Sequence, residues 1–148
     1  MPGPRVKTVG RLPRSAFASY SRKDISPVMQ RVAALSSIGV EVFVDCLDIK
    51  EGIQWKEVLD REIISRDTFL LFWSRHARES RWVEREWRHA LRVRGLAYIS
   101  PNALEPTELC PPPSELAGLQ FGSAQLLIAT SKASVRRKAS MKVAQCQT

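Results

Sequence analysis

Residues 68–91 have the sequence TFLLFWSRHARESRWVEREWRHAL, in which an apolar run is followed by a polar turn and a Trp-rich segment. The run 68–73 is short and apolar at consecutive positions, which is typical of a parallel strand covered on both faces. Ser80 is expected to cap the next helix with its side-chain oxygen. Apolar residues of that helix recur at helical spacing and form one buried stripe: Val83, Trp87, Ala90 and Leu91. This stretch predicts a central strand and a helix that packs on the sheet.

Strands and helices alternate along the rest of the chain. The other expected strands are short and bounded by turn residues: 15–20, 40–45, 96–99, which Pro101 closes, and an edge strand within 120–125. One helix is expected to start at Ser26 and Pro27 and to end at Gly39, and another contains Trp55 and Ile63 in register. This alternation predicts an α/β fold with a central parallel sheet and helices on both faces.

Composition limits the class of protein. A chain of 148 residues with 44% apolar content suits one compact domain, and no apolar run is long enough to span a bilayer. The basic N-terminus has no apolar core of the kind that a secretory signal needs, so a cytoplasmic location is expected, without a membrane partner. The three cysteines are an odd number with no C-x-x-C pair, which favours neither a disulfide framework nor a zinc site. No metal is expected.

The net charge of +8 is concentrated at the ends of the chain. Residues 1–14 and 131–148 hold nine of the 23 basic residues and no acidic one, which leaves 14 basic against 15 acidic residues between them. We therefore expect a nearly neutral domain over residues 15–130, preceded by a basic, disordered segment (1–14) and followed by a flexible basic tail (131–148). Disordered, solubilising ends are the favoured interpretation, and nucleic-acid binding through them is the weaker one.

Ligands of parallel α/β folds bind at the carboxyl ends of the strands. Polar residues follow three of the expected strands: Tyr20, Ser21 and Arg22 after the first, Asp45 and Asp48 after the second, and Ser74 after the third. Trp82 and Glu86 are four residues apart on the helix that comes next, so they are expected to stack beside its buried stripe at the pocket edge. Neither G-x-G-x-x-G nor G-x-x-x-x-G-K occurs, which excludes the usual dinucleotide and P-loop motifs.

Five ordered motifs carry a family resemblance: Phe17–Ser21 (FASYS), Val42–Asp45 (VFVD), Ile49-x-x-Gly52-x-x-Trp55, Phe69–Ser74 (FLLFWS) and Trp82-x-x-x-Glu86. Together they resemble the successive boxes of a TIR (Toll/interleukin-1 receptor) domain of the bacterial type. This resemblance implies a flavodoxin-like three-layer fold with a parallel sheet of about five strands. It also implies self-association, partly through the loop after the second strand. In many members it further implies cleavage of NAD, with the glutamate of the last box as catalytic residue.

The resemblance therefore suggests an NAD+ nucleosidase, a hydrolase that releases nicotinamide and a linear or cyclic ADP-ribose product, in signalling, innate immunity or bacterial defence. Glu86 would be catalytic, and NAD would be the substrate, with no cofactor. The expected substrate-binding residues are Tyr20, Ser21, Arg22, Asp45, Asp48, Trp55, Ser74 and Trp82. Cleavage needs no general acid, because the leaving nicotinamide is already cationic, and one carboxylate can stabilise the positive charge that spreads onto the ribose.

Two other interpretations stay open. Glu86 lies among Arg81, Arg85 and Arg88, so it can equally be a helix-surface acid next to tryptophans that only fill the core. The chain can also be a non-catalytic adaptor that uses the same fold to bind other TIR domains or sensor proteins. In the catalytic case, assembly into a homo-oligomer or filament is expected to switch the activity on.

Overall fold

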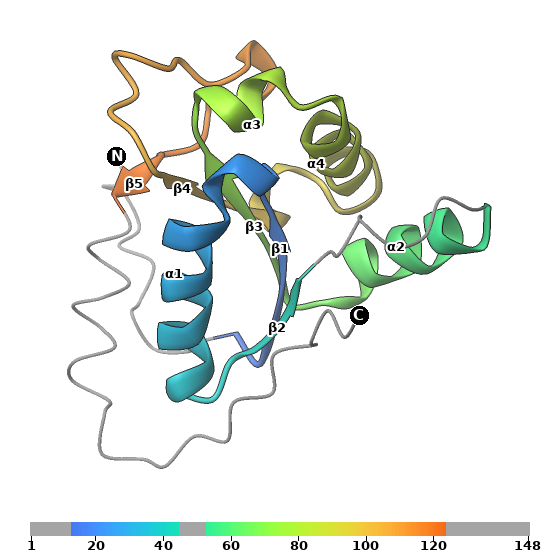
Figure 1. Ribbon diagram of the computed structural model, residues 1–148. Helices are drawn as coiled ribbons and strands as arrows, with labels where there is room; N and C mark the ends of the chain where they lie inside the picture. Colours follow the sequence, from blue (N-terminus) through green and yellow to red (C-terminus); the bar gives the residue numbers. More distant parts are fainter. Residues whose placement is uncertain (1–12, 45–52, 124–148) are drawn as a thin grey trace, which may run out of the picture.

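The computed structural model describes residues 13–44 and 53–123, which form a parallel sheet with helices on both faces (Figure 1). The sheet has five strands in the order β2-β1-β3-β4-β5, and every neighbouring pair is parallel. Its strands are β1 Ser15–Ser19, β2 Glu41–Val44, β3 Thr68–Trp73, β4 Ile99–Ala103 and β5 Gly122–Ser123. The predicted flavodoxin-like α/β class is confirmed.

Helix α1 covers one face of the sheet and the other helices cover the opposite face (Figure 1). The helices are α1 Ile25–Ser37, α2 Ile53–Ser65, α3 Arg75–Glu79 and α4 Arg81–Arg94, with 3-10 turns η1 Arg22–Asp24, η2 Leu96–Tyr98 and η3 Ser114–Leu116. No helix in the described ranges is long and apolar enough to cross a bilayer.

Alternate residues of β3 enter two separate cores. Leu70 and Phe72 pack with α1, whereas Phe69, Leu71 and Trp73 pack with α2, α3 and α4. This follows from the two-residue period of a strand, which sends successive side chains to opposite faces. Beside β3 on the second face, the rings of Phe17 and Phe69 stack with their centroids 5.5 Å apart. The strand predicted at residues 68–73 is therefore buried on both faces, as expected.

Helix α4 has the predicted start, and its predicted stripe is buried except for Leu91, which is half-buried. The Ser80 side chain accepts a hydrogen bond from the Val83 backbone N–H at 3.2 Å, which satisfies a free donor of the first turn. Val83, Trp87 and Ala90 are buried against the sheet. The helix ends at Gly95, whose φ of 84° is a conformation that glycine adopts without strain.

Several boundaries differ from the predicted ones. The polar turn after β3 contains the short helix α3, because Ser74 caps it. Helix α1 begins at Ile25, which places Pro27 within its first turn. The strand predicted at 96–99 is shifted: residues 96–98 form the 3-10 turn η2, and β4 runs from Ile99 through Pro101, where it was expected to close, to Ala103. Within the described residues β5 pairs with β4 only at Asn102 and Ala103. Pro101 therefore has a paired strand, β3, on one side and none on the other in the described part of the chain, so its missing N–H is tolerated.

The segments 1–12 and 124–148 lie outside the described residues, so the predicted basic ends stay predictions.

We predict that Trp87→Ala lowers the free energy of unfolding by about 3–5 kcal/mol, because it leaves a cavity between α4 and the sheet. Urea denaturation followed by circular dichroism measures the change. Arg81→Ala, at an exposed position of the same helix, is the control and should change stability by no more than about 0.5 kcal/mol. Equal effects of the two substitutions would show that α4 does not pack as described.

Candidate functional site

Glu86 is buried between α4 and the sheet, with 1% of its surface exposed. Its Oε1 accepts a hydrogen bond from the hydroxyl of Ser19 at 2.8 Å. This corrects the expected position of Glu86 at the pocket edge beside the buried stripe. Glu86 is three positions after Val83 and four positions before Ala90, and these spacings place all three side chains on the same face of the helix.

Ser19 is the last residue of β1 and is fully buried. Sequence analysis did not identify it as a site residue. The signal lay in the two-residue period of β1: Ala16 and Ala18 belong to the core on the α1 face, so Phe17 and Ser19 point to the face that α4 covers. A buried carboxylate is costly unless it is hydrogen-bonded, so a hydroxyl at this position stabilises Glu86.

The loop after β1 holds three of the predicted residues. Ser21 is buried, and its hydroxyl accepts a hydrogen bond from the Lys23 backbone N–H at 3.4 Å, which caps η1. Tyr20 is half-buried against the core on the α1 face, and Arg22 is exposed. Ser21 therefore has a local structural role, and the cationic side chain next to it is open to solvent.

Ser74 joins the loop after β3 to the loop after β1. It is fully buried, and its hydroxyl accepts from the Ala77 N–H at 3.0 Å and donates to the carboxylate of Asp24. Asp24 is itself 8% exposed and lies at the end of η1. Sequence analysis selected Ser74 but missed Asp24, although the polar run after β1 contains it. The structure thus brings the carboxyl ends of β1 and β3 together through one buried polar pair.

Trp82 is half-buried and packs against the same core as Trp87. The Arg85 guanidinium lies 5.2 Å from the centroid of the Trp82 ring, and the Arg88 guanidinium lies 4.5 Å from that of Trp87. Arg85 also forms an ion pair with Asp60 of α2, with an N–O distance of 3.2 Å. Arg88 pairs with Glu115 at 3.1 Å, so Arg85 and Arg88 each lie on an aromatic ring and pair with an acid of another segment.

For three predicted site residues the structure does not describe the side chain. Asp45 and Asp48 lie outside the described residues. Trp55 lies in the first turn of α2, where only the backbone is described. Their roles stay predictions.

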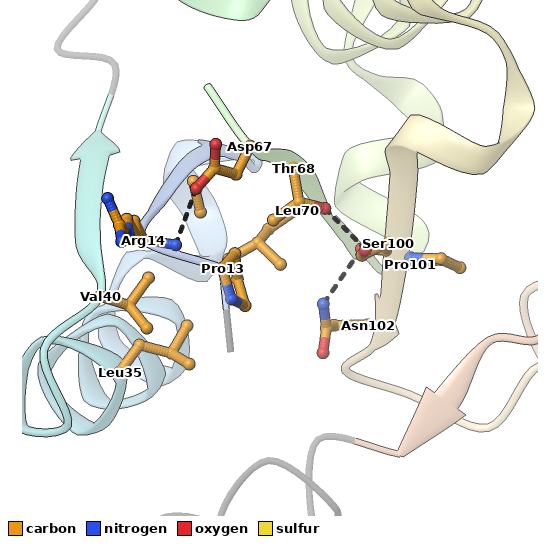
Figure 2. Close-up of a pocket in the computed structure, with 11 residues that line it drawn as sticks. Pro13, Arg14, Leu35, Val40, Asp67, Thr68, Leu70, Ser100, Pro101 and Asn102 are labelled. Carbon is orange, nitrogen blue, oxygen red and sulfur yellow. Dashed lines mark hydrogen bonds between the residues drawn. The ribbon is translucent and has the colours of Figure 1, made fainter. Parts of the chain in front are cut away.

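A pocket of about 720 Å³ lies elsewhere, on the α1 face near the amino ends of β1 and β3 (Figure 2). Leu35, Val40 and Leu70 form much of its apolar wall. Several of its polar groups bond to one another: the Arg14 N–H donates to Asp67 at 2.8 Å, and the hydroxyls of Thr68 and Ser100 are 2.8 Å apart. None of the predicted site residues lines it. We place the candidate site at the opposite edge, where strand ends and Glu86 meet.

Cys110 is buried, and burial raises the pKa of its thiol. A raised pKa leaves the thiol protonated at neutral pH, and the protonated form is a poor nucleophile. Among the residues that the structure describes, no three His, Cys, Asp or Glu side chains are grouped so as to hold a metal ion.

We predict that Asp24→Ala lowers the free energy of unfolding by about 1–3 kcal/mol, because it leaves the buried hydroxyl of Ser74 without its carboxylate acceptor. Chemical denaturation of the two single variants and of Asp24→Ala/Ser74→Ala tests the pairing, since coupled residues give non-additive changes. Lys23→Ala, in the same turn but exposed, is the control. Strict additivity would mean that the two loops are not joined by this contact.

The family model described as TIR domain matches residues 17–138, which include all five motifs named above. No curated protein matches the chain at a significant level.

Proposed function

The chain belongs to the TIR domain family, a family of signalling modules that act through TIR–TIR contacts, and on that premise we propose that it cleaves NAD with Glu86 as catalytic residue. The products would be nicotinamide and linear or cyclic ADP-ribose. The observation that carries the proposal is a buried carboxylate, fixed by a hydroxyl, at the carboxyl edge of a central parallel strand. Titratable groups held in such surroundings are candidates for catalysis.

In the proposed reaction the bond between the ribose anomeric carbon and the nicotinamide nitrogen breaks. The bonding electron pair leaves with nicotinamide, which becomes neutral, and the ribose carbon acquires positive charge. Water, or a nitrogen of the adenine ring in the cyclic case, then attacks that carbon and loses a proton. A negatively charged Glu86 opposite the ribose stabilises the positive charge, and its effect is strong because the surroundings are largely apolar.

The other predicted residues have roles in this proposal. Trp82 would wall the ribose pocket, and Tyr20, Ser21 and the exposed Arg22 would bind the adenosine and phosphates of NAD. Ser74 would hold the rim in shape through Asp24. Asp45, Asp48 and Trp55 would complete the nicotinamide side.

The burial of Glu86 also bears on regulation. With 1% of its surface exposed in the single chain, Glu86 is closed to a substrate. We propose that assembly with other copies, or with TIR or sensor proteins, opens this edge, and that the resulting activity serves signalling or defence in the cytoplasm. The same burial favours the second candidate function, a non-catalytic adaptor in which Glu86 only joins α4 to β1.

We predict that Glu86→Gln lowers the rate of NAD cleavage by at least about 100-fold, because Gln lacks the negative charge. Its amide oxygen can still accept the hydrogen bond from Ser19, so the free energy of unfolding should change by no more than about 1–2 kcal/mol. Nicotinamide release measured by liquid chromatography, together with thermal unfolding, tests both expectations.

Glu84→Gln is the matched control: the same substitution on the same helix, at an exposed carboxylate that pairs with Arg88 at 3.0 Å. It should leave cleavage unchanged. A Glu86→Gln variant as fast as the parent would exclude Glu86 as the catalytic residue. If the assembled parent releases no nicotinamide at all, the adaptor function is the correct one.

We predict further that specific activity rises with protein concentration, because assembly is proposed to open the site. Leu47, Ile49 and Ile53 are apolar residues in an otherwise polar stretch, and this pattern suggests a docking loop. In the structure Ile53 is the first residue of α2, whereas Leu47 and Ile49 lie outside the described residues. Leu47→Asp should abolish the concentration dependence. Specific activity that stays constant over about a hundredfold dilution would contradict activation by assembly.

A further inference from the structure

We infer that Ser19 is the residue that positions Glu86 for catalysis, an inference that rests on the proposed function and extends it to a residue that the sequence analysis did not select. Ser19 and Glu86 lie 67 positions apart in the sequence and meet through a hydrogen bond of 2.8 Å between the serine hydroxyl and Oε1. Both side chains are at least 99% buried. The contact is therefore an interior one that tertiary packing creates.

The donor lies on β1, a strand inside the sheet. β1 has a parallel neighbour on each side, and Ser19 pairs in register with Leu71 of β3. Glu86, by contrast, is on a helix and has a long side chain with three rotatable bonds. A hydroxyl fixed by the sheet can hold one end of that side chain and so limit the rotation of the carboxylate.

The chemistry of the pair suits a group that stabilises a cation. A hydroxyl that donates to a carboxylate favours its negatively charged form, which is the form that the proposed reaction needs. An arginine or lysine at this position would neutralise the carboxylate. Serine is uncharged, so it holds the carboxylate in place and leaves its negative charge available. Ser19 does not have to touch the substrate, and it acts through Glu86 alone.

The test compares the parent, Ser19→Ala and Ser19→Thr as full chains, at concentrations where the parent is assembled. Ser19→Ala should lower kcat for NAD cleavage by about 10- to 100-fold with KM changed by no more than about threefold, because the hydrogen bond that places the carboxylate is lost. Ser19→Thr restores a hydroxyl but adds a methyl group to a packed site, so it should recover most of kcat while melting below the parent.

Ser36→Ala is the matched control, a buried serine on helix α1 at the opposite face of the sheet, and its kcat should equal that of the parent. In a Glu86→Gln background, Ser19→Ala should have no further effect on the residual rate, because Ser19 acts only through the carboxylate. An additive loss in that background would overturn the inference.

The outcomes separate this inference from the proposed function. A parent that cleaves NAD, with Ser19→Ala retaining the parent kcat, overturns the role of Ser19 and leaves that of Glu86 intact. A parent that never cleaves NAD overturns both. If Ser19→Ala does not fold, Ser19→Cys replaces it, since its S–H is a weak donor of similar size: a kcat for Ser19→Thr well above that of Ser19→Cys supports positioning, and equal values refute it.

Discussion

The burial of strand β3 on both faces is the constraint on which the rest of the structure depends. Five of its six residues are buried, and they alternate between a core that α1 closes and a core that α2, α3 and α4 close. A strand with no wet face needs a layer of helices on each side, and parallel neighbours need crossovers to supply them. The order of the strands and the positions of the helices both follow from this requirement.

The same requirement concentrates polar chemistry at one edge of the sheet. Burying a polar group without a hydrogen-bond partner costs free energy. Four buried polar side chains lie near the carboxyl ends of β1 and β3, and they form pairs between residues far apart in the sequence: Ser19 with Glu86, and Asp24 with Ser74. Each pair links two elements that the backbone does not connect directly. The edge of the sheet proposed to bind a ligand is thus also the edge at which hydrogen bonds between side chains join α4 to β1 and the loop after β1 to the loop after β3.

Sequence analysis predicted β3 with its observed bounds and predicted the cap and buried stripe of α4, because those signals are local and repeat along the chain. It selected Glu86 but expected it beside the stripe, because the four-residue spacing from Trp82 indicated that both side chains lie on a neighbouring stripe. Ser19 and Asp24 were missed for another reason. The two-residue period of β1 indicates the face to which Ser19 points. The partners of Ser19 and Asp24 are 67 and 50 positions away, however, and a single sequence does not show which distant residues packing brings together.

The arginines that lie over aromatic rings have a consequence for the behaviour of the molecule in a crowded solution. Arg85 covers Trp82, Arg88 covers Trp87 and Arg94 lies 4.2 Å from the centre of Tyr98. A planar guanidinium hides the face of a ring from other molecules while staying hydrated itself, which a lysine does less well. Large aromatic side chains can then lie close to the surface without promoting non-specific association. Colloidal stability is therefore compatible with a module whose family acts through TIR–TIR contacts.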